Sequence, residues 1–155
     1  MNLFMEKIQM SQDIQATRSY FLWFFLGIIT GGICMVIYYL LNFLDLDEHN
    51  TRYAHREKAP STNAETWLMV LLCILIPGIG SLIAMYVKYS KLHDHLAVYQ
   101  GAPNIPDGLS ILLINIFLSW LTLGIITIYY EWKWQHVFNE HNYWHARNQS
   151  QIPIR

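Results

Sequence analysis

Residues 19–44 read SYFLWFFLGIITGGICMVIYYLLNFL, a stretch that has no charged side chain and carries a glycine pair near its middle. Two further stretches, residues 66–87 and 109–130, are also free of Asp, Glu, Lys and Arg. A helix of about 22 residues is about 33 Å long, enough to cross a hydrocarbon core of about 30 Å. We therefore expect an all-α integral membrane protein with transmembrane helices at about 19–44, 66–87 and 109–130.

The three stretches belong to copies of one 46-residue unit that follow one another without gaps. Similar residues recur in register at three places in the unit: Leu26, Leu72 and Leu118; then Gly32-Ile33, Gly78-Ile79 and Gly124-Ile125; then Glu48-His49, Asp94-His95 and Glu140-His141. Self-similarity at a fixed period is the signature of a repeat architecture. The repeat predicts a membrane helix that continues into a polar helical extension, three times over.

Composition sets the broad class and the expected boundaries. Only 14% of the 155 residues are charged, against roughly 25% in typical soluble domains. The net charge of −1 and the scattered Lys and Arg residues argue against a nucleic-acid partner. We expect a polar N-terminal segment at 1–18, a three-repeat helical membrane domain at 19–145 and a C-terminal tail at 146–155.

A second geometry is also compatible with the repeat. Each apolar stretch contains a helix breaker near its middle: Gly31-Gly32, Pro77-Gly78 or Gly124. If the chain reversed there, each unit would be a re-entrant hairpin and all three would point the same way. Irregular backbone at that depth must be sheltered by protein, and a chain of this length offers little shelter. Glycine and proline are tolerated in spanning helices, so three crossings are the favoured prediction.

The glycine motifs resemble those of a known family. The three motifs are Thr122-Leu123-Gly124-Ile125 followed by Tyr129-Tyr130, Trp132 and Lys133; Thr30-Gly31-Gly32-Ile33 with Tyr38; and, more weakly, Pro77-Gly78-Ile79 with Tyr86. They resemble the T-x-G-I-Y-x-x-Y-W-x-Y-K pattern of the bacterial membrane-protein family catalogued as domain of unknown function 4234. The chain departs from that pattern after each Gly-Ile, where Cys34, Gly80 and Ile126 replace the tyrosine. The resemblance implies tandem membrane segments in the cell membrane and supplies no activity.

Small residues within the apolar stretches are candidates for helix packing. Gly27 and Gly31 form a G-x-x-x-G pair, and Gly80 and Ala84 form a second small pair, which lets helix backbones approach closely. Asn115 is the clearest polar group in an apolar stretch and suits a hydrogen bond between helices. The full predicted packing set is Gly27, Gly31, Gly32, Gly78, Gly80, Ala84, Asn115 and Gly124.

The acid–histidine pairs are the candidate metal or pH-sensitive site. His141 and His145 stand four residues apart, so they share one face of a helix and suit a common metal. The candidate ligands are His141, His145, Glu140, His49 and Glu48. Three crossings would place Asp94-His95 on the opposite side of the membrane from the other two pairs, and only the hairpin geometry would unite all three. The competing interpretation is that these are polar groups on helical extensions, with no metal and no cofactor.

No P-loop, hydrolase elbow, H-E-x-x-H or C-x-x-C motif is present, which argues against an enzyme. No ionisable residue lies in the apolar stretches, which argues against an ion-coupled transporter. The leading hypothesis is a non-enzymatic, multi-pass protein of the cell membrane that acts as a packing, accessory or self-associating component. Its partners would be the lipid bilayer and a second copy or another membrane protein. The alternatives are a metal- or pH-responsive membrane protein and a small oligomeric transporter or channel.

Overall fold

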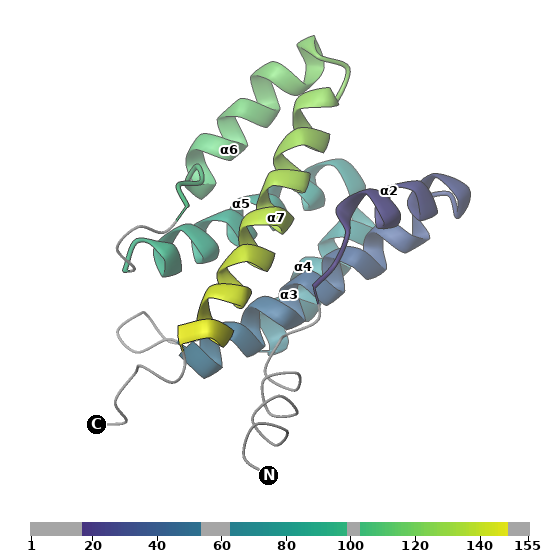
Figure 1. Ribbon diagram of the computed structural model, residues 1–155. Coiled ribbons are helices and arrows are strands. Elements are labelled where there is room, and N and C mark those ends of the chain that lie inside the picture. The colour runs from purple at the N-terminus through teal and green to yellow at the C-terminus, as the bar shows by residue number, and fades with distance from the viewer. Residues whose placement is uncertain (1–16, 54–62, 99–102, 149–155) are drawn as a thin grey trace.

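A computed structural model describes residues 17–53, 63–98 and 103–148, and the regular secondary structure of these residues is all helical (Figure 1). Its elements are α2 (Tyr20–Ile29), α3 (Ile33–Tyr53), α4 (Asn63–Leu75), α5 (Pro77–Leu96), α6 (Gly108–Ile114), the π-helix η1 (Asn115–Ser119) and α7 (Ile125–Asn148). The predicted N-terminal segment and C-terminal tail lie outside the described residues, except for 17–18 and 146–148.

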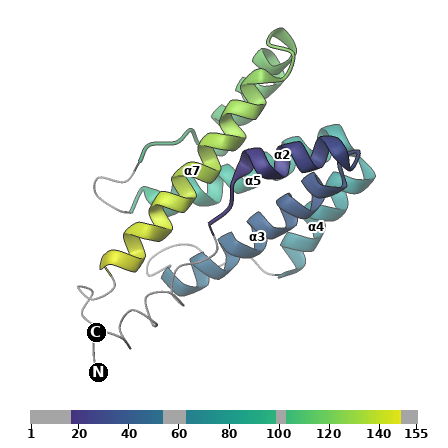
Figure 2. The same ribbon diagram turned by 45° about the vertical axis from the view of Figure 1, so that its right-hand side comes forward.

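Each apolar stretch folds as a helical hairpin, which corrects the prediction of one continuous helix through 19–44, 66–87 and 109–130. The first hairpin is α2 and α3, the second is α4 and α5, and the third is α6 with η1 and α7. Figure 2 shows the turns of all three on the side away from the C-terminal end of α7. Among the described residues, no helix combines the length and the apolar character needed to cross a bilayer.

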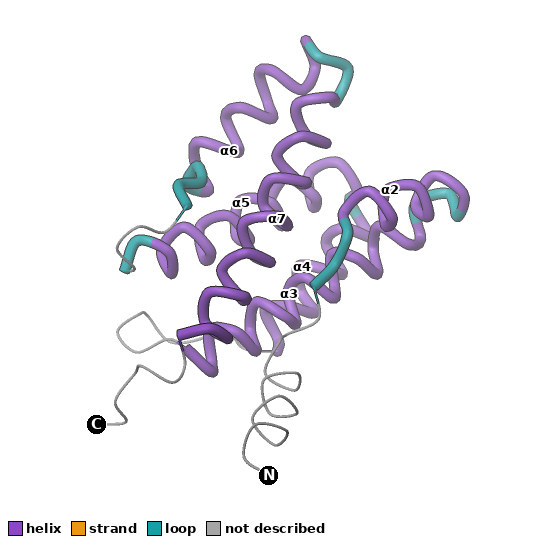
Figure 3. The backbone as a smooth tube through the Cα atoms, viewed as in Figure 1, coloured by secondary structure: helices purple, strands orange, loops and turns teal. Residues whose placement is uncertain are grey.

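The first and third hairpins turn by the same hydrogen bonds. Gly32 N–H donates to Gly27 O at 2.7 Å, and Gly124 N–H donates to Ser119 O at 2.8 Å, two repeat lengths further on. Gly32 has φ +96° and Gly124 has φ +84°, a left-handed region where a side chain on an L-residue is strained. A glycine ending a helix in this conformation is the usual C-terminal capping arrangement. The glycines therefore reverse the chain, and Figure 3 shows the resulting short turns.

The second hairpin turns by a different device. Pro77 occupies the first turn of α5, where its missing N–H and fixed φ suit a helix start. Ile76, just before it, has φ −134° and ψ 71°, so α4 ends at Leu75. Beyond the turn, a Cβ placed on Gly80 would lie 2.1 Å from the backbone oxygen of Leu72. Gly80 thus lets the two legs of this hairpin touch backbone to backbone.

The predicted packing residues divide into two groups. Close contacts are made by Gly80, by Gly27, whose added Cβ would lie 2.5 Å from Met35 Cγ, and by Ala84, which is fully buried. Asn115 accepts a hydrogen bond from Thr127 of α7 at 2.6 Å, so it joins the legs of the third hairpin. The remaining four lie near the turns, and a Cβ built on any of them would meet nothing within 4 Å: Gly31, Gly32, Gly78 and Gly124.

The long helices α3, α5 and α7 pack in layers that follow the repeat. Leu46, Leu92 and Phe138 occupy the same repeat position and are buried in one hydrophobic cluster. This layer lies one turn before the three repeat-related histidines. Because the copies fold alike, residues 46 positions apart meet at the same height, and this brings the histidines together.

Candidate metal centre

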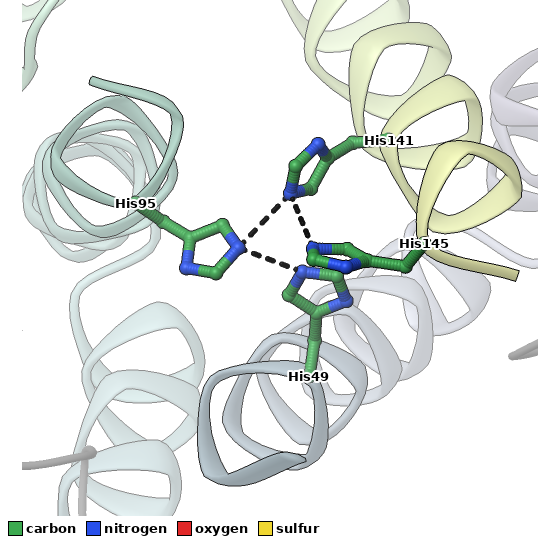
Figure 4. Close-up of side chains that lie close together, drawn as sticks. All are labelled: His49, His95, His141 and His145. Carbon is green, nitrogen blue, oxygen red and sulfur yellow. Dashed lines mark hydrogen bonds between the residues drawn. The ribbon is translucent and has the colours of Figure 1, made fainter. Parts of the chain in front are cut away.

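Four histidines converge where α3, α5 and α7 approach one another. His49, His95 and His141 hold one repeat position, one on each long helix, and His145 follows His141 by one turn on α7. Figure 4 shows the four rings pointing toward a common centre. The hairpin geometry places all three acid–histidine pairs at one end of the molecule, which corrects the expectation that Asp94-His95 lies opposite the others.

Three contacts between the rings join Nε2 atoms. His49 and His95 are 3.0 Å apart, His95 and His141 are 2.9 Å apart, and His141 and His145 are 3.0 Å apart, each measured between Nε2 atoms. One candidate ligand atom from each histidine lies within 4.8 Å of the others. None of the four residues is more than 3% exposed. A tetrahedral Zn²⁺ bound by imidazole nitrogens at about 2.0–2.1 Å would need nitrogens about 3.4 Å apart. The three close contacts would lengthen by about 0.4 Å, and the wider separations, of up to 4.8 Å, would shorten to admit the ion.

Hydrogen bonds alone cannot satisfy all three Nε2 contacts. A neutral imidazole has one N–H and one lone-pair nitrogen, so each Nε2 either donates or accepts. In the chain of three Nε2 contacts, at most two can be complete hydrogen bonds, because each donor has a single proton. A metal ion accepts the lone pairs of all four at once. The donor set therefore fits a cation better than it fits a hydrogen-bonded network.

The surroundings keep two of these rings, His49 and His141, neutral, as metal binding requires. Burial first, and then the neighbouring histidines, lower the pKa of His49 to about 2 from its ordinary 6.5. The same causes in the same order lower the pKa of His141 to about 3. Two neutral rings at pH 7 have lone pairs ready for an ion, and loading would displace no protons from them.

Aromatic side chains close the site. The ring of Tyr53 stacks on His145, with centroids 3.9 Å apart and planes 11° apart. Trp144 lies parallel to His141 at 6.0 Å, and Phe138 meets His49 edge-on at 5.4 Å. These contacts restrict ring rotation and exclude water. An orientation fixed before binding is what a preorganised metal site needs.

The acidic members of the pairs lie outside the cluster. Glu48 is exposed and pairs with Arg52 at 2.9 Å, and Glu140 is exposed and lies 3.4 Å from His136. Successive side chains on a helix point about 100° apart, so a residue next to a buried histidine faces outward. The candidates Glu48 and Glu140 are therefore replaced by His95. The 46-residue spacing indicates His95, but the three-crossing topology assigned it to the other side.

A second buried polar cluster was not predicted. The ammonium of Lys88 bonds Glu131 in an ion pair whose two side chains are 0% and 2% exposed. Tyr39 donates to the other carboxylate oxygen of Glu131 at 3.1 Å, and the Lys88 nitrogen lies 4.4 Å from the ring centroid of Trp134. Burial lowers the pKa of Lys88, while Glu131 opposes that shift by favouring the ammonium form. The sequence indicates one contact of this cluster, because Lys88 and Trp134 occupy the same repeat position.

Comparison of the chain with models of known families, with curated proteins and with solved structures found no match. The resemblance to domain of unknown function 4234 therefore stays a prediction. The candidate site stands on its geometry alone.

Proposed function

We propose that this is a metal-binding protein whose four-histidine centre joins its three helical hairpins. The observation that carries the proposal is the convergence of four buried Nε2 atoms from α3, α5 and α7. Each hairpin contributes at least one ligand, so one ion would fasten all three. The role is structural and non-enzymatic: the ion fixes the mutual arrangement of the hairpins.

The donor set favours a tetrahedral transition-metal ion. Imidazole nitrogen suits Zn²⁺, Cu and Ni ions, whereas Mg²⁺ and Ca²⁺ prefer oxygen ligands. Four protein ligands would fill the coordination sphere of Zn²⁺ and leave no position open for substrate, as in structural zinc sites. Zn²⁺ is the ion we assign, because it accepts tetrahedral geometry without a competing preference of its own.

We also infer that the turns of the hairpins insert into a lipid bilayer. Large apolar side chains are exposed at all three turns, where Ile29 is 79%, Leu75 is 66% and Leu123 is 93% exposed. The leading legs α2 and α4 have 10 and 13 residues, which corresponds to about 15 to 20 Å. That depth is about half to two thirds of a hydrocarbon core of about 30 Å. Hairpins of this length suit entry from one side into one leaflet.

Polar and aromatic side chains lie where such hairpins would leave the bilayer. Arg18 and Asp45 pair at 2.8 Å, and Lys91 and Glu65 pair at 3.0 Å. Trp132, on α7 just past the apolar stretch, is partly exposed. Aromatic side chains and ion pairs are favoured at the boundary between lipid and water. The protein would thus be a membrane protein with its metal centre outside the hydrocarbon.

Metal analysis tests the first half of the proposal. Protein purified through a tag without histidines, then analysed by inductively coupled plasma mass spectrometry, should contain one equivalent of metal per chain. His49→Ala should lose it, whereas His136→Ala, which changes an exposed histidine outside the cluster, should keep it. Wild-type protein that stays metal-free after incubation with Zn²⁺ would contradict the proposal.

Cysteine labelling tests the second half. In a background lacking Cys34 and Cys73, single cysteines at the exposed positions of Glu48, Asp94 and Glu140 are probed with a membrane-impermeant maleimide. All three should label from the same side of sealed vesicles. Labelling of the middle position from the opposite side would overturn entry from one side. Failure of the protein to float with liposomes would overturn membrane insertion itself.

A further inference from the structure

A cavity of about 440 Å³ lies between α5 and the third hairpin, at the height of the π-helix η1. Its size falls within the usual range of small-molecule sites, about 300–1,000 Å³. Asn115 and Ser119, which begin and end η1, both line it. π-helical segments of this kind occur frequently at functional sites. The metal centre lies at the other end of α7 and does not involve this cavity.

The four hydroxyls that line the cavity offer hydrogen-bond acceptors. Thr127 Oγ1 donates to Asn115 Oδ1 at 2.6 Å, and Ser119 Oγ uses its proton on the same oxygen or on Thr127. Ser81 Oγ donates to Gly78 O at 2.9 Å. Tyr39, which also lines the cavity, donates its hydroxyl proton to Glu131. All four hydroxyls thus donate their protons within the protein. A ligand can therefore bind them only as a hydrogen-bond donor to their lone pairs.

The cavity offers no net charge to a ligand. Among the residues that line it there is no Asp, Glu, Lys, Arg or His. Glu131, the carboxylate to which the lining residue Tyr39 donates, is already paired with Lys88. A charged ligand would lose its hydration without gaining a counter-charge, which is costly in apolar surroundings. The lining therefore favours an uncharged ligand.

The rest of the lining is apolar and leads to the surface assigned above to lipid. Leu82 and Ile116 line the cavity, and Trp120 beside them is 83% exposed. A ligand that fits has an uncharged donor at one end and an apolar body that follows these side chains outward. We propose that this cavity binds an uncharged amphiphile whose polar end is an alcohol. The inference rests on the membrane half of the proposed function and not on the metal.

Native mass spectrometry with matched amphiphiles tests the inference. Oleyl alcohol, oleylamine and oleate share one chain and differ in the charge of the headgroup. The detergent-solubilised protein should take up one saturable equivalent of the alcohol and neither of the other two. Equal uptake of all three, or preference for the amine or the acid, would overturn the proposal. Liposome flotation is measured in parallel, so loss of membrane binding is distinguished from loss of the cavity ligand.

Variants test whether the alcohol binds in this cavity. Ser81→Phe should fill the cavity and abolish alcohol binding, and Ser119→Ala combined with Thr127→Val should weaken it about tenfold, the effect of about one lost hydrogen bond. Thr51→Val, a matched change at an exposed position of α3, should leave binding unchanged. Helix content by circular dichroism confirms that each variant is folded. Alcohol binding that persists in folded Ser81→Phe protein would place the ligand elsewhere and end the proposal.

Discussion

The metal-centre end and the turn end of the hairpins use the same repeat in opposite ways. At the metal end, the three copies place the same residue type, His49, His95 and His141, in one buried cluster. At the turns, the copies differ: two reverse through glycines with positive φ and one through a proline. Each turn closes within its own hairpin. The comparison teaches that the repeat-related histidines bring residues of all three hairpins together, whereas each turn only forms its own hairpin.

Removing one histidine of the metal centre is the strongest test of this comparison. His95→Ala should abolish metal binding and remove the dependence of stability on metal. In the wild-type protein, a chelator should lower the free energy of unfolding by about 4 kcal/mol, the stabilisation given by a ligand at about 1,000 times its Kd. Thermal unfolding with and without chelator measures both. His136→Ala is the control and should respond like wild type. A chelator effect that survives in the His95 variant would show that the metal is bound elsewhere.

The buried ion pair between the two ends gives the next effect. Lys88→Met would leave Glu131 buried without its partner, so the free energy of unfolding should fall by about 3 kcal/mol. Replacing both residues, as Lys88→Met with Glu131→Leu, should recover much of the loss, because apolar substitutes for a buried pair are often neutral. Urea unfolding followed by circular dichroism reports both. A single variant as stable as wild type would mean that water reaches the pair.

The ion pair also marks a limit of prediction from sequence. The histidines share a repeat position, so their meeting follows once the hairpin geometry is known. Lys88 and Glu131 occupy different repeat positions, and no periodicity joins them. Each lies one residue beyond an apolar stretch, where a charged residue is typical of a helical extension exposed to water. Only the packing of α5 against α7 brings the two side chains together and buries them.

In the metal-free protein, lowering the pH should reduce stability through the buried histidines at the metal end. His49 and His141 have pKa values of about 2 and 3 in the folded chain, below the unfolded value of 6.5. At a pH between the folded and the unfolded pKa, the unfolded chain therefore binds more protons than the folded chain. Stability should therefore fall as pH drops below about 6.5, by up to about 1.4 kcal/mol per pH unit for each ring. Unfolding midpoints at pH 7, 6 and 5 measure this. Metal-loaded protein should lose stability at least as steeply, because bound rings take up no protons while the unfolded chain does, and metal-free protein whose stability does not fall would contradict the assignment.

The smallest effects belong to the turns. Gly124→Ala forces a side chain into the left-handed region and should cost about 1–2 kcal/mol, with no change in metal content. Gly78→Ala is the matched control, since Gly78 lies within α5 and an added Cβ would meet nothing within 4 Å. It should be neutral or stabilising by up to about 1 kcal/mol. Loss of metal from the Gly124 variant would show that turns and metal centre are not independent.

The turns explain why the hairpins were not the favoured prediction. All-helical structure, the three apolar stretches and the position of each breaker are visible in the sequence. A glycine such as Gly32 or Gly124 is compatible with a spanning helix and with a turn, because either φ is open to it. The deciding contacts, Gly32 N–H to Gly27 O and Gly124 N–H to Ser119 O, exist only after the chain has reversed. The error in topology then removed His95 from the candidate ligands.

X-ray absorption at the metal edge of the loaded protein tests the central claim most directly, because it counts and identifies the ligands. Four nitrogen donors at about 2.0–2.1 Å, with the outer-shell pattern of imidazole rings, are the predicted result for Zn²⁺. His95→Ala protein treated with the same ion should show no bound metal. A first shell with oxygen or sulfur donors, or with six ligands, would contradict a centre built from His49, His95, His141 and His145.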